Sequence, residues 1–363
     1  MFAETGGIRR TVYPRHEAGI PSLSWVSMVE EVVPHATFAG TGFYVPDRVV
    51  TNAELTRYMD TSDEWIVERS GIHERRWVGD GMSGAEMARR ASLMALDEAG
   101  MEPSDIDAIV LATLSPDHFF PGTGVFLQRE LGLATIPALD IRAQCSGFVY
   151  GLSVADAWIR CGQYRTILLV GVEIQSTGID VSTRGRDIAV LFGDGAGAAV
   201  LTASEEVGRG VLSTHIHSDG RHAETLWTEV ASSRKAQRIT VEDIEAGRHF
   251  PTMNGRDVFK HAVSRMPEVV LEALAASDLQ PSDIDLLIPH QANLRISQMV
   301  QRRLGLPDEK VVNNIQSYGN TTAATIPIAL AEAVRADRLQ AGQLLCLVAF
   351  GSGFTWGSAL VRW

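Results

Sequence analysis

Cys145 is the residue of this chain best placed to act as a nucleophile. It follows a strand-like stretch that ends at Arg142 and precedes a helical stretch. The positive end of a helix dipole lowers the pKa of a neighbouring thiol and so raises the fraction of reactive thiolate. On position alone, a buried structural cysteine is an equal alternative. Cys161 closes a helical stretch and Cys346 lies inside an apolar strand, so we interpret both as structural.

Two polar residues in the second half of the chain could assist such a nucleophile. His290 follows the apolar run Leu286-Leu287-Ile288, at a strand end of the kind that carries functional groups in α/β folds. Asn320 lies in the turn-like sequence Tyr-Gly-Asn-Thr-Thr. Taken singly, a structural histidine and an asparagine in an ordinary turn or helix cap remain open interpretations.

The elements that would position these residues occur twice. From about Ala36, short β-rich runs alternate with helical stretches, which is typical of an α/β fold. The sequence Pro-Ser-Asp-Ile-Asp occurs at 103–107 and at 281–285, each time between an amphipathic helical stretch and an apolar strand. The units around Cys145 and Asn320 repeat at nearly the same spacing. We therefore predict duplicated α/β halves that pack about a pseudo-twofold axis and bring these two loops together.

The duplication predicts the organisation of the chain. We divide it into an N-terminal extension of uncertain order, 1–35, a half that carries the nucleophile, 36–212, and a half that carries His and Asn, 213–363. The glycine-rich run 193–198 imitates a dinucleotide-binding fingerprint, but a strand rather than a helix follows it. We therefore expect its glycines to allow close backbone packing at the centre of the molecule.

Composition excludes several classes of protein. The 363 residues are 45% hydrophobic and carry a net charge of −12 without a prominent basic run, which argues against nucleic-acid binding. Three scattered cysteines indicate a reducing, cytoplasmic setting and neither a disulfide framework nor a metal site. The apolar runs are of strand length, so we expect no membrane span, and we expect no signal peptide.

Six collinear motifs decide between these interpretations. Cys-Ser-Gly-Phe at Cys145, Pro-His-Gln-Ala-Asn-Leu-Arg-Ile at His290 and Gly-Asn-Thr-Thr-Ala-Ala at Asn320 resemble the 3-oxoacyl-(acyl-carrier-protein) synthase III family of the thiolase superfamily. The segments 61–72, 192–198 and 350–362 resemble it as well. The resemblance implies an α/β, thiolase-like fold: a layered α-β-α-β-α sandwich with pseudo-twofold symmetry.

The resemblance also implies a reaction. Cys145, His290 and Asn320 would form the catalytic triad, and the backbone N–H groups of Cys145 and Ser352 would form the oxyanion hole. The family usually has glycine where this chain has Ser352. Thiolases carry a second catalytic cysteine in the C-terminal glycine-rich loop, which here reads Gly-Ser-Gly. Elongating synthases use two histidines, and chain-length factors lack the nucleophile.

Binding roles follow from the same resemblance. Acyl-CoA and malonyl-acyl carrier protein would be the substrates, no resident cofactor or metal is implied, and a homodimer is expected in which Phe120 closes the acyl pocket of the second copy. The implied contacts are Trp65, Arg69, Arg184 and Asn293 for CoA, Phe120 and Phe350 for the acyl pocket, and Lys260, Arg295, Arg302 and Arg303 for the carrier protein.

Three functions fit this pattern to different degrees. The leading one is a decarboxylating Claisen condensation that initiates fatty-acid synthesis from an acyl-CoA. The alternative is a starter-loading condensing enzyme or acyltransferase of a secondary-metabolite pathway, alkylquinolone-like or polyketide, because Asp-Ile-Arg-Ala-Gln before Cys145 departs from the family's usual small residues. The third is a non-catalytic partner subunit, which an intact triad disfavours. The polar stretch 222–250 is expected to line or cover the acyl channel.

Overall fold

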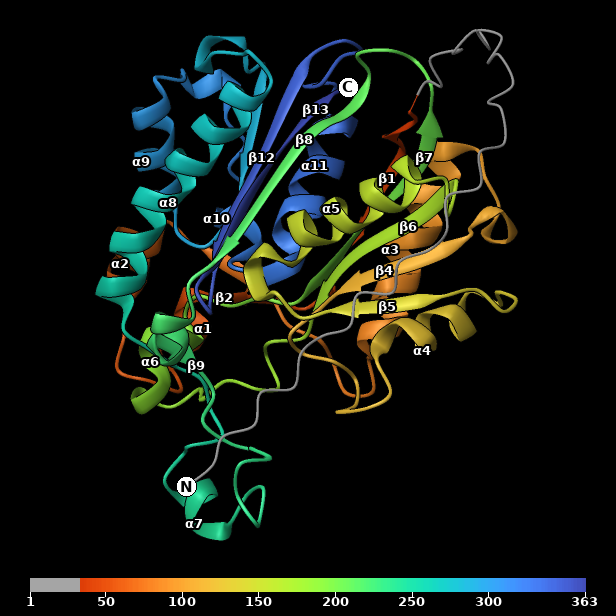
Figure 1. Cartoon of the computed structure of the whole chain (residues 1–363). Coiled ribbons are helices and arrows are strands. Elements are labelled where there is room, and N and C mark those ends of the chain that lie inside the picture. Colours follow the sequence, from red (N-terminus) through yellow and green to blue (C-terminus); the bar gives the residue numbers. More distant parts are fainter. Residues whose placement is uncertain (1–32) are drawn as a thin grey trace, which may run out of the picture. The chain divides into compact units, whose positions relative to one another are not determined.

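The computed structural model describes residues 33–363. Most of the predicted extension 1–35 lies outside the described residues, and the first strand, β1, already begins at His35. None of the described helices has the length and apolar character that crossing a bilayer needs. The described residues form two main sheets and the helices that cover them (Figure 1).

The first sheet contains five strands in the order β1-β7-β6-β4-β5. The strands β4, β5 and β6 run parallel, whereas β7 is antiparallel to both β6 and β1. This mixed sheet agrees with the alternating strands and helices of the sequence. The strand bounds are β1 His35–Tyr44, β4 Ala108–Ala112, β5 Ala138–Ile141, β6 Thr166–Glu173 and β7 Gly195–Ser204.

The second sheet repeats the first strand for strand. Its order, β11-β12-β13-β8, has one parallel pair followed by two antiparallel pairs, as in β4-β6-β7-β1. A single parallel bridge between Leu287 and Val311 corresponds to the pairing of β4 with β5. The duplication predicted from the sequence is therefore visible in the topology. The bounds are β8 Gly210–Ser218, β11 Leu286–Pro289, β12 Leu344–Gly351 and β13 Thr355–Arg362.

The predicted division between 212 and 213 falls inside β8, a strand of the second sheet. The chain passes from the first sheet to the second between Ser204, where β7 ends, and Gly210, where β8 begins.

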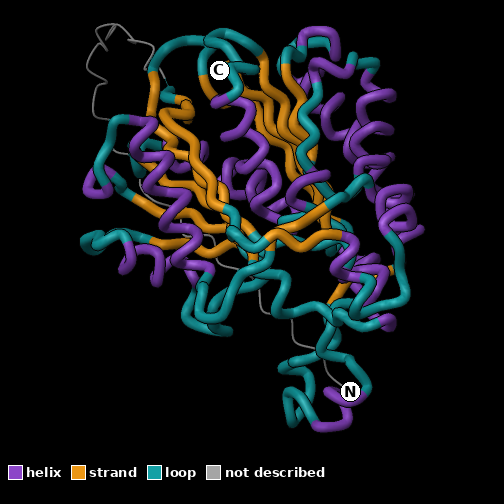
Figure 2. Tube along the Cα trace, turned by 180° about the vertical axis from the view of Figure 1, so that it is seen from behind, coloured by secondary structure: helices purple, strands orange, loops and turns teal. Residues whose placement is uncertain are grey.

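Helices and sheets alternate in five layers, as the resemblance implied. The helices α5 and α11 lie between the sheets and share one core with both, in which Phe148 and Leu330 are fully buried (Figures 1 and 2). The helices α3 and α4 cover the outer face of the first sheet, and α8 and α9 cover that of the second. The bounds are α3 Gly84–Ala99, α4 Thr123–Glu130, α5 Gly147–Arg160, α8 Gly255–Ala276, α9 Leu294–Leu304 and α11 Thr325–Arg335.

The repeated Pro-Ser-Asp sequence forms the same short helix in both halves, η1 Pro103–Asp105 and η5 Pro281–Asp283. Each begins with proline after a reciprocal capping box, made with Glu102 in the first half and Gln280 in the second. Because these caps satisfy the exposed N–H groups, the chain can turn sharply from an outer helix into a buried strand.

The glycine-rich run 193–198 enters β7, which packs against α11. A Cβ added at Gly197 would lie 2.7 Å from both Ile328 N and Pro327 Cβ, closer than real contacts allow. The glycines here serve close packing between sheet and helix, as we predicted.

The remaining elements are short. The strand β9 pairs with β10, and Figure 1 shows α7 in the excursion between them, away from both sheets. These elements are β2 Val49–Thr51, β3 Glu74–Arg76, β9 Leu226–Trp227, β10 Thr252–Met253, α1 Asn52–Leu55, α2 Asp63–Ser70, α6 Arg186–Ala189, α7 Val241–Glu245, α10 Ile315–Tyr318, η2 Gln144–Ser146, η3 Thr183–Gly185, η4 Gly220–Thr225, η6 Asp308–Lys310 and η7 Thr322–Ala324.

Candidate active site

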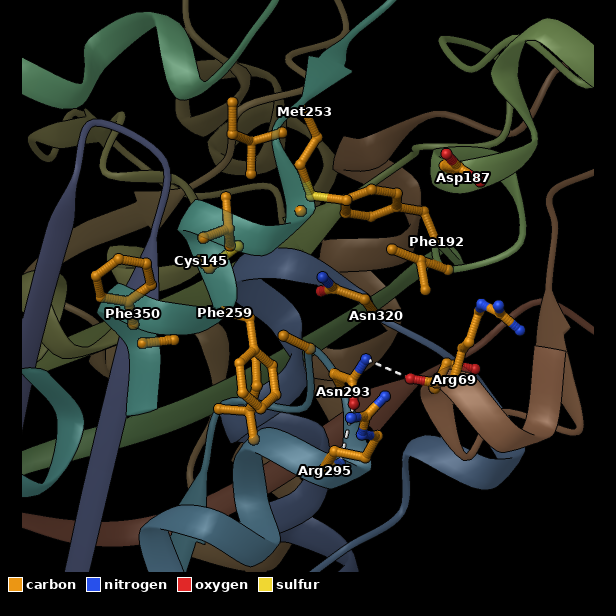
Figure 3. A pocket seen from close by; sticks show the side chains of 18 of the residues that line it. Arg69, Cys145, Asp187, Phe192, Met253, Phe259, Asn293, Arg295, Asn320 and Phe350 are labelled. Atoms are coloured by element: carbon orange, nitrogen blue, oxygen red, sulfur yellow. Dashed lines mark hydrogen bonds between the residues drawn. The ribbon is translucent and has the colours of Figure 1, made fainter. Parts of the chain in front are cut away.

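Cys145, His290 and Asn320 line one cavity of about 500 Å³. Cys145 lies in η2, the short turn between β5 and α5, and only 7% of its surface is exposed. The preceding residue, Gln144, has a φ of 46°, a left-handed conformation that costs a residue other than glycine free energy and often marks a functional turn. The strained turn and the following helix direct Cys145 into the cavity (Figure 3).

The protonation of Cys145 differs from our expectation. Burial, together with the nearby Glu173, raises the pKa of the thiol to about 12, whereas we expected the N-terminus of α5 to lower it. The sequence indicated the helix but not the depth of burial, and desolvation is the larger effect. Burial therefore favours the protonated thiol at Cys145.

His290 follows β11, and its backbone N–H donates to Val348 O at 2.8 Å. Its ring Nδ1 lies 2.6 Å from Thr325 Oγ1, and that hydroxyl also lies 3.1 Å from Thr322 O. When the hydroxyl donates to Nδ1, the ring proton is on Nε2, which then becomes a donor. Nε2 is buried and has no hydrogen-bond partner within residues 33–363. Burial lowers the imidazole pKa to about 3, so the ring is neutral near pH 7.

Asn320 is held by both its backbone and its side chain. Its N–H donates to Leu191 O at 2.8 Å and its carbonyl accepts from Gly193 N at 3.1 Å, so a segment of the first half clamps this loop of the second. Its Oδ1 accepts from the backbone N–H of Thr322 at 2.8 Å. This bond orients the amide so that its Nδ2 group is the end available to the cavity. Figure 3 shows Asn320 among the side chains that line the cavity.

A buried carboxylate supports the two loops that meet here. Glu173, at the end of β6, accepts hydrogen bonds from Ser115 Oγ at 2.5 Å and from the backbone N–H groups of Leu114, at 3.1 Å, and of Ala323, at 3.5 Å. Burial raises its pKa to about 7, although these donors act in the opposite direction. Glu173 thus ties η7, which follows Asn320, to the end of β4.

The glycine-rich loop between β12 and β13 passes directly over the nucleophile. A Cβ added at Gly351 would lie 3.0 Å from both Cys145 N and Cys145 Cβ. The backbone that runs on to Ser352 therefore lies close to Cys145. The Ser352 hydroxyl itself donates to Leu226 O.

The cavity mouth is formed by α2 and α6. The guanidinium of Arg69 lies 4.5 Å from the ring centroid of Trp65, and that of Arg186 lies 4.7 Å from it. The resemblance implied Arg184 on the far face of an adenine that stacks on Trp65, a place that requires the bound CoA. Arg184 lies over Phe250 and donates to Asp180 at 2.6 Å.

Asn293 connects α9 to the end of α2 at the cavity mouth. Its Oδ1 accepts from Arg295 N at 2.9 Å and so caps α9, and its Nδ2 donates to Arg69 O at 2.8 Å, at the end of α2 (Figure 3). It lines the cavity, but these contacts also give it a structural role.

The two predicted acyl-pocket residues lie in different places. Phe350 is buried and lines the cavity beside Cys145. Phe120 is 79% exposed, and the neighbouring Phe119 is 67% exposed. Phe120 is not among the cavity-lining residues of this chain.

The predicted docking residues Lys260, Arg295, Arg302 and Arg303 all have exposed side chains on α8 and α9. Arg295 also lines the cavity mouth, where its guanidinium lies 5.7 Å from the ring centroid of Phe259.

Several residues that support the cavity-lining side chains were missed by sequence reasoning. Arg186 lies in the sequence Arg-Gly-Arg, where the motif alone did not tell which arginine faces Trp65. Thr325 ends the Gly-Asn-Thr-Thr-Ala-Ala-Thr run, so its hydroxyl was visible but its partner in His290 was not. Glu173 was detectable as a carboxylate that ends an otherwise apolar strand.

Comparisons with known proteins agree with this geometry. Two family models match, 3-oxoacyl-[acyl-carrier-protein (ACP)] synthase III at residues 139–220 and its C-terminal model at residues 274–363. The beta-ketoacyl-[acyl-carrier-protein] synthase III of Xanthomonas euvesicatoria is 48% identical over 329 residues, which cover 91% of this chain and 98% of that protein.

Two solved structures are similar along most of their length. The 3-oxoacyl-[acyl-carrier-protein] synthase III of Aquifex aeolicus is 40% identical, with a TM-score of 0.83, and the match covers 90% of this chain and all of that one. The enzyme of the same name from Pseudomonas aeruginosa is 39% identical, with a TM-score of 0.82, over 91% of this chain and 98% of that one.

Proposed function

Because the chain belongs to the 3-oxoacyl-[acyl-carrier-protein] synthase III family and is an acyltransferase that initiates fatty-acid synthesis, we propose that Cys145, His290 and Asn320 carry out its two half-reactions. The observation that supports this division of labour most strongly is their convergence in one cavity. One loop supplies a buried thiol, and the other half supplies two nitrogen groups, His290 Nε2 and Asn320 Nδ2, for an oxygen of the substrate.

In the first half-reaction, Cys145 Sγ attacks the thioester carbonyl of an acyl-CoA. A carbon–sulfur bond to Cys145 forms, the bond to CoA breaks, and the proton of the thiol ends on the CoA sulfur. The N–H groups of Cys145 and Ser352 stabilise the oxyanion of the tetrahedral intermediate. The N-terminus of α5 favours the thiolate that develops during attack, even though burial keeps the resting group protonated.

In the second half-reaction, the malonyl group of malonyl-acyl carrier protein loses CO2. The electrons of the broken carbon–carbon bond pass into an enolate, whose oxygen receives hydrogen bonds from His290 Nε2 and Asn320 Nδ2. The Thr325 hydroxyl at Nδ1 fixes the orientation of the imidazole, and donation from Nε2 requires the single hydroxyl proton to turn from Thr322 O to Nδ1. The enolate carbon then attacks the acyl group, and Cys145 leaves as a thiolate that regains a proton from solvent. The product is a 3-oxoacyl-acyl carrier protein.

We propose that the adenine of CoA stacks on Trp65 in place of the Arg186 guanidinium, which would have to move aside, with Arg184 on the opposite face of the adenine, Arg69 near the phosphates and Asn293 as a further CoA contact. The place of Trp65, Arg69 and Asn293 at the mouth supports this assignment, since an arginine over an aromatic ring provides a flat cationic surface. The exposed cations Lys260, Arg295, Arg302 and Arg303 would attract the acidic carrier protein.

We further propose a cytoplasmic homodimer without a resident cofactor. The exposed Phe119 and Phe120 and the unpaired edge of β5 support an interface on this side, because apolar side chains and free strand edges are normally covered. Phe120 would then close the acyl pocket of the second copy. The reaction uses only thiol, imidazole, amide and backbone groups.

Initiation of fatty-acid synthesis is favoured over starter loading in a secondary pathway. The relatives that are 47–48% identical carry the name beta-ketoacyl-[acyl-carrier-protein] synthase III. The unusual residues before Cys145 therefore do not by themselves indicate the alternative function.

The test is a reconstituted reaction of the purified full chain with acetyl-CoA and malonyl-acyl carrier protein, in which CO2 release and the mass of the carrier protein are followed. The proposal predicts one CO2 for each 3-oxobutyryl-acyl carrier protein. Acetyl transfer to added carrier protein with a free thiol, without CO2 release, would identify a simple acyltransferase. No reaction with acetyl-, isobutyryl-, octanoyl- or benzoyl-CoA would refute the proposal.

A further inference from the structure

Ser352 connects the loop over the nucleophile to a wall of the acyl pocket. Its hydroxyl donates to the backbone carbonyl of Leu226 in β9, and the side chain of Leu226 lines the cavity with Cys145 and Phe350. The two residues are far apart in the sequence, so this bond joins two separate parts of the active site.

One side of the loop is fixed to the nucleophile. Gly351 is in van der Waals reach of Cys145, and the next strand begins with two hydrogen bonds to the nucleophile turn. Thr355 Oγ1 donates to Ala143 O at 3.2 Å, and Thr355 O accepts from Ser146 Oγ at 3.0 Å.

The other side of the loop is fixed to residues 219–227. Phe354 and Asp219 exchange two backbone hydrogen bonds, of 2.8 and 2.9 Å. The rings of Phe354 and His222 are stacked, with centroids 5.0 Å apart and planes inclined by 18°. Ser352 adds the bond that reaches furthest along this segment, to the residue that faces the cavity.

On its other side, the segment that receives this bond is held by a hydrogen bond from Asn254 N to Thr225 O at 2.8 Å and by a short strand pairing. The strand β9 has only two residues, and it pairs with β10, whose Met253 also lines the cavity. Between them the chain leaves the body of the molecule in the excursion that contains α7 (Figure 1). A bulky acyl group that pushes Leu226 outward would therefore meet little resistance from β9 itself, and would pull on Ser352 through the carbonyl.

We propose that Ser352 is a positioning residue that couples starter size to the oxyanion hole, so that small acyl groups are transferred faster than large ones. Oxyanion donors act only within about 2.7–3.1 Å of the oxygen, so a small displacement of the Ser352 N–H slows acyl transfer. Small starters leave Leu226 in place and keep this N–H in position. This inference rests on the proposed function, because it requires acyl loading on Cys145.

A double-mutant cycle of Ser352→Ala and Leu226→Ala tests the coupling. The rate of acyl-enzyme formation is measured by intact-mass spectrometry with acetyl-CoA and with octanoyl-CoA, and the octanoyl-to-acetyl ratio of kcat/KM is compared. Ser352→Ala retains the backbone N–H and removes only the hydroxyl. We expect it to slow acetyl loading several-fold and to raise the ratio about tenfold. Ser352→Gly should raise the ratio similarly.

Leu226→Ala removes the side chain that the starter would push but leaves the carbonyl that Ser352 binds. We expect it to raise the ratio, and we expect Ser352→Ala to change the ratio less than twofold when added to it. An unchanged ratio in both Ser352→Ala and Ser352→Gly, or the same change in both backgrounds, would overturn the inference. Failure of the wild-type protein to load any acyl group would instead refute the proposed function.

Discussion

The ends of two equivalent strands show how a duplicated fold produces one active site. In the first half β6 ends at Glu173, whose buried carboxylate binds the loops on either side. In the second half β12 ends at Gly351, which has no side chain and lets the backbone approach Cys145. Both strands pair with an antiparallel neighbour in the same way. The same strand position thus carries a carboxylate that supports neighbouring loops in one half, and a glycine that lets the backbone approach Cys145 in the other.

The two central loops differ in a similar way. Each contains a non-glycine residue with positive φ, Gln144 at 46° and Thr322 at 52°, as the first residue of a short helix that leads into a central helix. The first loop presents a nucleophile, and the second presents an amide. The comparison indicates that the duplicated backbone was kept while the chemistry of the halves diverged.

Among the variants of the two loops, replacement of Cys145 should have the largest effect on activity. Cys145→Ala removes the thiol that we propose holds the acyl chain, so acyl loading should fall by more than roughly 10⁴-fold. Intact-mass spectrometry after incubation with acyl-CoA measures the loss, and Cys161→Ala is the matched control, since that thiol is exposed and outside the cavity. An acyl adduct that persists in Cys145→Ala would show that another residue is the nucleophile.

Replacing a donor of the second half should separate the half-reactions. His290→Ala and Asn320→Ala each remove one hydrogen bond to the enolate, and each should slow condensation by roughly 10²- to 10³-fold. Acyl loading should stay within about tenfold of the wild-type rate. Equal loss of loading and condensation would contradict the separate roles, and circular dichroism would check that the variants fold.

Adding one carbon atom to the end of β12 tests the close approach. Gly351→Ala places a Cβ 3.0 Å from Cys145 N and Cβ, so the loop or the nucleophile must move by a few tenths of an ångström. We expect acyl loading to slow by roughly tenfold, as a partly displaced oxyanion donor would cause. The control is Gly79→Ala, where a new Cβ meets no atom within 4 Å. A wild-type rate for Gly351→Ala would show that the loop adjusts freely.

The carboxylate at the end of β6 predicts a pH dependence of stability. Glu173 titrates at about pH 7 when folded, against an ordinary value of 4.5, so the folded state binds more protons between these values. Its contribution to the free energy of unfolding therefore falls as pH rises from about 4.5 to about 7, by on the order of 3 kcal/mol. Urea unfolding of wild type and Glu173→Gln at several pH values measures it. Parallel curves for the two proteins would contradict this prediction.

The smallest effect is expected at the cavity mouth. Arg295→Glu reverses an exposed charge, so the KM for malonyl-acyl carrier protein should rise roughly fivefold, the change that about 1 kcal/mol produces. The KM for acyl-CoA should change less. Arg209→Glu, in the exposed loop between β7 and β8, is the control. An unchanged carrier-protein KM would remove Arg295 from the docking surface.

Much of the fold was predictable because the same short sequence motifs occur in both halves of the chain. The repeated Pro-Ser-Asp caps and the apolar strands after them follow from short-range rules, and they indicated the order of elements in both halves. The boundary predicted at 212/213 falls inside β8, because the chain already passes to the second sheet in the short loop between Ser204 and Gly210.

The candidate site was predictable in its residue types and not in its electrostatics or contacts. Cys145 at a helix start was visible in the sequence, but the raised pKa depends on burial and on Glu173, which is brought in by tertiary packing. The choice between Arg184 and Arg186 depends on a short turn whose orientation local sequence does not determine. The bond between Ser352 and Leu226 joins distant segments and was equally invisible.

The central claim is that the acyl group waits on Cys145 until the second half of the molecule generates the carbon nucleophile. Pulse–chase mass spectrometry of the Cys145 peptide tests it: wild type and Asn320→Ala are loaded with acetyl-CoA, freed of excess, and mixed with malonyl-acyl carrier protein. We predict that wild type loses the acetyl mass within one turnover as 3-oxobutyryl-acyl carrier protein appears, whereas Asn320→Ala retains it at least a hundredfold longer. Equally rapid discharge in both proteins, or product that appears without passing through acetylated Cys145, would contradict the account.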